Sequence, residues 1–178
     1  PAFAGYRALM LLAMTDLSFI SAISMEVWER WAPIILAYPS SALGGKEQLH
    51  LDLVKLAYTS SPEAIIQTLI VLIDVQNRDH GDLFITRKME ECWDSRLCSA
   101  LAAKLTDQNL GPKCVAQLLS DLIGRDILEA RLFAEGLLSS PIASSGNLRE
   151  KSVAAARVLL TKAKDAGWSV IWPIFQQD

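Results

Sequence analysis

Histidine and cysteine are scarce in this chain, and their scarcity limits the chemistry that it can support. Its 178 residues include two histidines and three cysteines. Two imidazoles exclude a histidine-rich metal centre and leave few candidates for a general base. Cys92, Cys98 and Cys114 are spaced C-x5-C-x15-C, without the C-x2-C pairs that build zinc sites, and an odd number does not complete a disulfide framework. We therefore expect no metal and no catalytic centre built on these residues.

Long apolar runs are also missing. The longest stretch without a charged residue, 31–45, is interrupted by two prolines and ends in two glycines, whereas a membrane-spanning helix needs roughly 18 apolar residues. No basic segment followed by an apolar one marks a secretory signal. We expect a cytoplasmic protein that does not enter a membrane.

Positive charge is in deficit. Lysine and arginine total 17 against 20 aspartates and glutamates, which gives a net charge of -3 and a sequence pI near 5.4. This sign opposes binding to phosphate backbones or anionic lipid, so nucleic acid and membrane surfaces are not expected partners. The hydrophobic share of 51% is ample for a sizeable core and excludes a disordered tail.

The apolar residues recur at helical spacing almost throughout. Leu49, Leu53 and Leu56 lie three or four residues apart, as do Leu97 and Leu101. No stretch alternates with the period of two that a strand requires. The sequence therefore predicts an all-α fold. The expected helices are 3–15, 25–38 with a break or kink at Pro33, 46–58, 62–77, 85–92, 95–106, 112–123, 125–138, 149–164 and 167–176.

Local capping signals support these boundaries. Pro62 and Pro112 are suited to the first turn of a helix, Asp94 to an N-cap and Gly124 to a helix end. Serine, proline and glycine make 139–147 the clearest loop, and it is too short to separate independent domains.

Similar helix pairs begin near Leu53, Leu101 and Ala156. Their second helices start at Pro62, Pro112 and Trp168, which are 50 and 56 residues apart, slightly more than the roughly 40–47 residues of HEAT and armadillo repeats. This pattern favours an α-solenoid of HEAT-like antiparallel helix pairs, with a closed helical bundle as the alternative. The predicted solenoid is a single domain, 1–178, with units of approximately 1–38, 46–77, 95–123 and 125–176.

A family resemblance lies in the repeat endings. The segment KDAGWSVIWP at 164–173, followed by QQD at 176–178, resembles a repeat ending in the helical-repeat region of bacterial NACHT-type STAND signalling ATPases. VWERWAPII at 27–35 looks like another such unit, and PAFAGYRAL at 1–9 looks like the opening helix of a repeat. The chain also lacks an initiator methionine, so we interpret it as a piece of a longer polypeptide.

The resemblance implies a non-catalytic segment of a larger signal-transduction ATPase. Such repeats serve as a sensor, an autoinhibitory surface or a protein-interaction surface, and their partners are other proteins or other domains of the parent chain. Any ATPase activity then lies outside the fragment. A scaffold or adaptor without a switch and a small helical enzyme remain alternatives.

No phosphate-binding loop is recognisable. Gly44-Gly45-Lys46-Glu47 is the one candidate, but the pattern G-x-x-x-x-G-K-[ST] requires glycine where Ser40 stands and a hydroxyl where Glu47 stands. We therefore expect no nucleotide and no other cofactor.

The two histidines have structural interpretations. His80 follows Asp79 in a polar stretch, which predicts a solvated loop. His50 lies between Leu49 and Leu51, which predicts a helix residue that is partly covered.

The remaining candidates are cysteines, tryptophans and one charge cluster. We expect Cys98 and Cys114 to be buried and Cys92 to be exposed and reactive. The tryptophans at 28, 31, 168 and 172 have helical spacing and aliphatic neighbours, which predicts packing between helices. If the last two lie on an uncovered terminal repeat, that face would drive homodimer formation. The mixed charges of 87–96 indicate a solvated helix face or the rim of a partner surface; they are Arg87, Lys88, Glu90, Glu91, Asp94 and Arg96.

Overall fold

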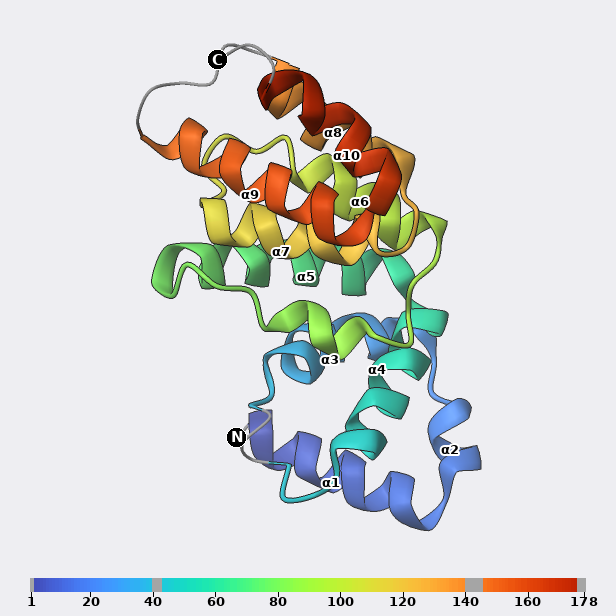
Figure 1. The fold of residues 1–178 in the computed structure, drawn as a ribbon. Helices are drawn as coiled ribbons and strands as arrows, with labels where there is room; N and C mark the ends of the chain where they lie inside the picture. Colours follow the sequence, from blue (N-terminus) through green and yellow to red (C-terminus); the bar gives the residue numbers. More distant parts are fainter. Residues whose placement is uncertain (1, 40–42, 140–145, 176–178) are drawn as a thin grey trace. The chain divides into compact units, whose positions relative to one another are not determined.

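The computed structural model describes residues 2–39, 43–139 and 146–175. Within these ranges the chain is helical and contains no strand, which confirms the all-α prediction. The elements in Figure 1 are α1 (Ala2–Thr15), α2 (Leu17–Ser21), α3 (Met25–Ala37), α4 (Glu47–Ser60), α5 (Pro62–Asp79), η2 (Ile85–Met89), α6 (Ser95–Lys104), α7 (Pro112–Ile123), α8 (Leu128–Ser139), α9 (Asn147–Lys162) and α10 (Lys164–Phe175). None of the helices in the described ranges is both long and apolar enough to cross a membrane.

Most helices begin and end within about three residues of the predicted bounds, and three differences are larger in kind. The short helix α2 was not predicted, because five residues are too few to show a helical period. The segment expected to be helical over 85–92 forms only the 3-10 turn η2. Helix α3 runs without interruption through Pro33. Residues 140–145 of the expected loop, Ser40 and the last three residues, 176–178, lie outside the described ranges.

The predicted caps are present at two helix starts. The Asp94 carboxylate accepts a hydrogen bond from the backbone N–H of Leu97 at 2.9 Å and so caps α6. Gly111 is the N-cap of α7, with Pro112 in its first turn. The Asp94 carboxylate gives a first-turn N–H of α6 a hydrogen-bond acceptor, and Pro112 has no N–H that would need one.

Helix α7 ends at Gly124 as predicted, but the left-handed residue of this turn is Asp126, with φ 58°. The N–H of Asp126 donates to Ile123 O at 3.0 Å, and the N–H of Ile127 donates to Leu122 O at 3.1 Å. These two bonds are the pair of a Schellman motif, whose left-handed position usually holds glycine. Aspartate is one of the few other residues that tolerate this conformation.

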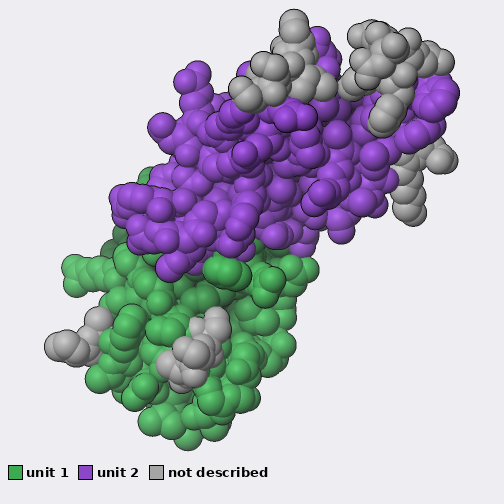
Figure 2. Space-filling view, turned by 60° about the vertical axis from the view of Figure 1, so that its left-hand side comes forward, with its two compact units in different colours: residues 1–73, 84–93 green, residues 74–83, 94–178 purple. Residues whose placement is uncertain are grey.

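The chain divides into two compact units, coloured separately in Figure 2. Unit 1 contains residues 1–73 and 84–93, and unit 2 contains 74–83 and 94–178. In unit 1, α4 packs against α3, α1 and η2. Their inner faces bury a core that includes Tyr6, Trp28 and Leu53.

In unit 2, α9 packs against α7, α8 and α10. Small residues permit close packing here, since Ala130, Ala134 and Ala155 are fully buried beside larger side chains such as Leu118. The closest approach lies at Gly167, because a Cβ atom on this residue would lie 2.1 Å from Leu159 O.

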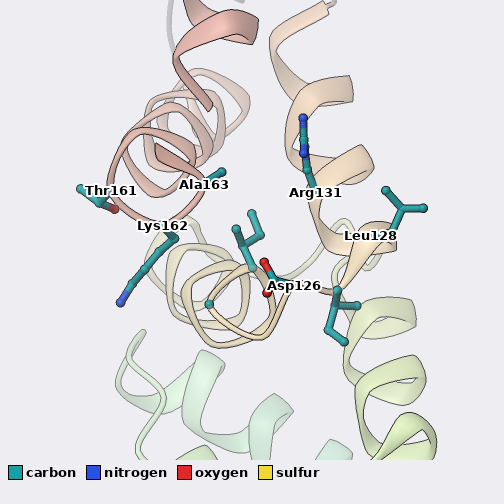
Figure 3. A pocket seen from close by; sticks show the side chains of 9 residues that line it. Asp126, Leu128, Arg131, Thr161, Lys162 and Ala163 are labelled. Carbon is teal, nitrogen blue, oxygen red and sulfur yellow. The ribbon is translucent and has the colours of Figure 1, made fainter. Parts of the chain in front are cut away.

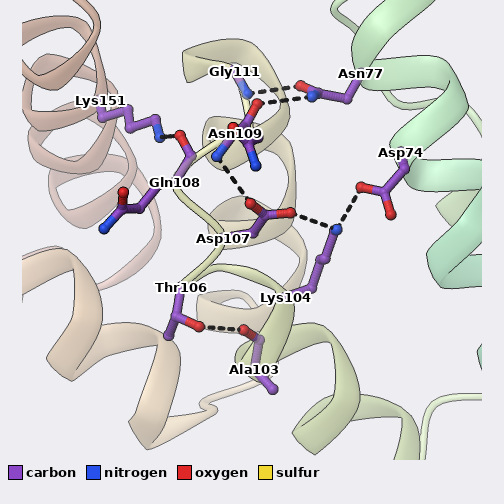
Figure 4. A network of polar contacts seen from close by, with 10 residues as sticks. All are labelled: Asp74, Asn77, Ala103, Lys104, Thr106, Asp107, Gln108, Asn109, Gly111 and Lys151. Atoms are coloured by element: carbon purple, nitrogen blue, oxygen red, sulfur yellow. Dashed lines mark hydrogen bonds and ion pairs between the residues drawn. The ribbon is translucent and has the colours of Figure 1, made fainter.

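An asparagine of unit 2 fixes the turn between α6 and α7. The Asn77 amide donates to Asn109 O at 3.0 Å, and its Oδ1 accepts from the Gly111 N–H at 2.7 Å (Figure 4). Both hydrogen bonds are made to backbone groups of the turn, which, unlike those inside a helix, have no backbone partners of their own. The start of α7 is thereby held against the end of α5.

Two lysines attach the same turn to its surroundings. Lys104 forms ion pairs with Asp74 and with Asp107, the latter at 2.8 Å (Figure 4). The ammonium of Lys151, a residue that is 8% exposed, donates to Gln108 O at 3.0 Å. These contacts are local to unit 2 and make up much of the polar network drawn in Figure 4.

Candidate functional site

The residues expected to carry chemistry are widely separated. His80 lies just after α5, and its side chain is exposed, as predicted for a solvated loop. All three cysteines are buried, so the prediction of an exposed, reactive Cys92 is wrong: this residue follows η2 and is only 5% exposed. Burial of Cys98 and Cys114 is confirmed. Within the described ranges, no three histidine, cysteine, aspartate or glutamate side chains are grouped as a metal site would require.

The glycines of the tested phosphate loop lie immediately before α4. Gly44 and Gly45 have positive φ values of 58° and 81°, and Lys46 is the N-cap residue. Glu47 begins the helix and places a carboxylate where a phosphate loop has a hydroxyl. Ser40, the other mismatched position, lies outside the described residues.

His50 is a buried polar residue of unit 1. It is 2% exposed, so the expectation that it is only partly covered is wrong. The sequence places His50 on a helix among leucines, but α1, η2 and the segment after α3 cover it almost completely. The Tyr6 hydroxyl lies 2.6 Å from His50 Nδ1, whereas Nε2 is buried and has no hydrogen-bond partner among the described residues. Burial lowers the pKa of His50 to about 4, with the Lys88 charge as a second cause, so the ring is neutral at pH 7.

Aromatic rings surround this histidine. The centroids of the Tyr6 and Tyr38 rings lie 4.7 Å apart, and those of Tyr6 and His50 lie 5.8 Å apart in an edge-to-face arrangement. Arg7 Nε donates to the Tyr38 hydroxyl at 3.1 Å. Burial raises the pKa of Tyr6 above its ordinary range, so its phenol stays protonated.

Lys88 departs from the charge cluster to which the sequence assigns it. Its ammonium donates to Leu36 O at 2.6 Å and to Tyr38 O at 2.5 Å, so it satisfies carbonyls at the end of α3 instead of facing solvent. Burial lowers the pKa of Lys88 to about 8. Glu91, by contrast, is exposed and binds Lys55 at 3.2 Å, as expected of a solvated face.

A cavity of about 360 Å³ lies beside these groups in unit 1. Its volume falls within the range of small-molecule sites, roughly 300–1,000 Å³. Its lining combines apolar walls with a few polar side chains: Leu43, Glu47, His50, Leu51, Phe84, Arg87 and Lys88. The Arg87 guanidinium lies over the Phe84 ring, with Cζ 5.9 Å from the ring centroid.

Unit 2 has a larger pocket of about 650 Å³ between the α7–α8 turn and the end of α9 (Figure 3). Asp126 lies at its centre, but Thr161 and Lys162 point away from it (Figure 3). A binding site for a polar ligand requires polar side chains that converge on one point. Those of this pocket do not.

Unit 2 also exposes large apolar side chains at helical spacing. Leu128 and Leu132 on α8 are 60% and 56% exposed, and Trp168 and Trp172 on α10 are 47% and 48% exposed. The two indole rings have centroids 5.4 Å apart. The prediction that Trp28, Trp31, Trp168 and Trp172 pack between helices is thus confirmed for Trp28, which is buried, and wrong for Trp168 and Trp172. Trp31 is partly buried, with its ring centroid 6.5 Å from that of Tyr6.

Sequence reasoning missed the grouping of Tyr6, Tyr38, His50 and Lys88. Its members come from α1, the segment after α3, α4 and η2, and no spacing in the sequence links them. The one local signal was a histidine among leucines at 49–51, which marks a polar group on a covered helix face.

Comparison of the chain with protein-family models, curated proteins and solved structures finds no match.

Proposed function

We propose that this chain is a non-catalytic protein-interaction, sensor or autoinhibitory segment of a larger signal-transduction ATPase of the NACHT-type STAND class. The proposal builds on the resemblance of 27–35 and 164–173 to repeat units of that class. In this role the segment binds a partner protein or another domain of the parent chain, and the cytoplasm is its expected location.

The observation that carries the proposal is the Trp168–Trp172 pair. Two neighbouring indoles, tilted against each other and each about half exposed, present a large, rigid apolar surface. Tryptophan is enriched among the residues that dominate binding energy at protein interfaces. Both side chains come from one face of α10, because residues four apart lie one above the other on a helix.

The proposed architecture is an α-solenoid of HEAT-like antiparallel helix pairs. Within unit 2, α9 packs on its neighbour α8 and also on α7, the helix two before it. Contacts with the adjacent helix and with the next but one are what stacked helix pairs make. Small-angle X-ray scattering tests this architecture, since a compact 178-residue bundle has a radius of gyration of roughly 16 Å and a solenoid exceeds it.

The test of function replaces Trp168 and Trp172 by alanine in the parent protein. An autoinhibitory surface predicts a higher basal ATPase rate in the double variant, and a sensor surface predicts the loss of partner-stimulated activity. Self-association of the fragment, measured by sedimentation, should weaken in the same variant if these residues form a homodimer contact. Phe19→Ala is the matched control, because Phe19 is an aromatic residue of unit 1 that is 57% exposed. The proposal fails if the double variant and the control behave alike in all three measurements.

A further inference from the structure

The unit 1 cavity has two features of a ligand site that the protein-interaction role does not use. One is a buried histidine nitrogen, His50 Nε2, which has no hydrogen-bond partner in the part of the chain that the structure describes. Leaving such a group unsatisfied destabilises the folded state, and native proteins rarely do so without a reason. The other is Lys88, which lines the same cavity beside it.

The hydrogen bond to Tyr6 decides what His50 can offer. The Tyr6 hydroxyl has His50 Nδ1 as its one acceptor within the described residues. If Tyr6 donates to Nδ1, the neutral ring carries its proton on Nε2. The opposite arrangement also makes one hydrogen bond, but it leaves the phenol proton without an acceptor and relies on the phenol oxygen, which accepts more weakly than an imidazole nitrogen. His50 therefore presents an N–H donor.

Lys88 offers a second donor. An ammonium has three N–H groups, and two of them bind Leu36 O and Tyr38 O. No third acceptor is found in the ranges that the structure describes, so one N–H remains. Both residues line the cavity, and unused donors in its lining suit a group that only accepts hydrogen bonds, as a carboxylate does.

The rest of the lining fits an apolar body with one negative charge. Arg87 and Lys88 carry two positive charges against the single negative charge of Glu47, and His50 is neutral. Leu43, Leu51 and Phe84 supply apolar walls. An aromatic ring in the ligand would have the Phe84 ring as a partner of the same kind.

We propose that the cavity between α4 and η2 in unit 1 binds a small carboxylate that carries an apolar, preferably aromatic, body. The carboxylate accepts a hydrogen bond from Lys88 Nζ, the covered His50 N–H favours negative charge nearby, and the body lies against Leu51 and Phe84. Arg87 adds positive charge at the same lining.

The test measures binding of 3-phenylpropionate to the whole chain by isothermal titration calorimetry and NMR, with 3-phenylpropionamide as the neutral probe. The carboxylate should bind at least about tenfold more tightly than the amide, and the His50 Nε2 resonance should move on binding. Absence of binding, or equal affinity for both probes, overturns the proposal.

Two pairs of variants locate the site. Leu51→Trp fills the cavity and should weaken binding of 3-phenylpropionate at least about tenfold, whereas Val71→Trp, at an exposed position of the same unit, should not. Lys88→Met should have the same effect as Leu51→Trp, with Lys113→Met as its control. If Lys88→Met fails to fold, Leu51→Trp alone decides: unchanged affinity in that variant overturns the proposal. The tryptophan variant of unit 2 should bind the probe normally, so this test and the test of the proposed function fail independently.

Discussion

The Tyr6 hydroxyl and His50 Nδ1 lie 2.6 Å apart, although 44 residues separate them in the chain. This contact joins α1 to α4 inside unit 1, and it is the one hydrogen bond of a histidine ring that is almost fully buried. The neutral imidazole is therefore part of the folded state, and protonating it has an energetic cost.

Acid should destabilise the protein through His50. The pKa of this ring is about 4 in the folded protein and near its ordinary value of 6.5 when unfolded. Below pH 6.5 the unfolded chain binds the proton first, so stability falls as the pH decreases from 6.5 to 4. At pH 4 the free energy of unfolding is lower by about 3 kcal/mol through this group alone. Urea unfolding at a series of pH values measures it.

His50→Gln is the control for this titration, because an amide oxygen accepts the Tyr6 hydrogen bond and has no proton to gain. Exposed carboxylates titrate in both proteins, so the difference between them isolates the histidine. Equal losses of stability in the two proteins between pH 7 and pH 4 would show that His50 is not the titrating group.

Local signals in the sequence were sufficient to predict most of the helices. Asp94 and Pro112 mark helix starts by their own chemistry, whatever the rest of the chain does. The helix α2 escaped prediction, and the expected helix at 85–92 forms only a 3-10 turn, because such short segments have no measurable period.

The candidate site could not be predicted, because its burial is set by residues distant in the chain. His50 is covered by Tyr6, and Lys88 reaches the carbonyls of Leu36 and Tyr38 some 50 residues earlier. In the sequence Lys88 stands among charged neighbours and has the pattern of a solvated face. The opposite error concerns Trp172, whose apolar neighbours indicated packing while the structure exposes it.

The three thiols should be protected in the folded protein. Cys92, Cys98 and Cys114 are buried, and burial raises the pKa of the Cys98 and Cys114 thiols. A thiolate is the reactive form, so both access and ionisation oppose modification. We expect labelling by a thiol reagent to be at least about a hundredfold slower than in concentrated guanidinium chloride, because it requires local opening. A thiol that reacts rapidly in the native protein would show that its cysteine is accessible and not buried, and mass spectrometry would locate it.

Asn77 should contribute to stability through the turn before α7. Asn77→Ala removes the partners of Asn109 O and of the partly buried Gly111 N–H, and we expect a loss of about 1 kcal/mol in the free energy of unfolding. Asn77→Asp keeps the acceptor for Gly111 and should lose less. Gln67→Ala, at an exposed position of the same helix, is the control for helix propensity. If Asn77→Ala is no less stable than Gln67→Ala, water replaces both hydrogen bonds of the Asn77 amide without a loss of stability.

Two glycines of unit 2 should respond in opposite directions to alanine. A Cβ atom at Gly167 would lie 2.1 Å from Leu159 O and 2.5 Å from Leu159 C, both of which are backbone atoms of α9. Backbone cannot turn aside as a side chain can, so Gly167→Ala must push α10 away from α9, and we expect a loss of about 1–3 kcal/mol.

Gly136 lies inside α8, and a Cβ atom there would meet no other atom within 4 Å. Gly136→Ala should therefore stabilise the protein by about 0.5–1 kcal/mol, because alanine restricts the unfolded chain and favours the helix. Urea unfolding of both variants, each with circular dichroism to confirm helix content, measures the contrast. A neutral Gly167→Ala together with a stabilising Gly136→Ala would mean that α10 moves away from Leu159 without loss of packing, and that the close contact of these two helices contributes nothing to stability.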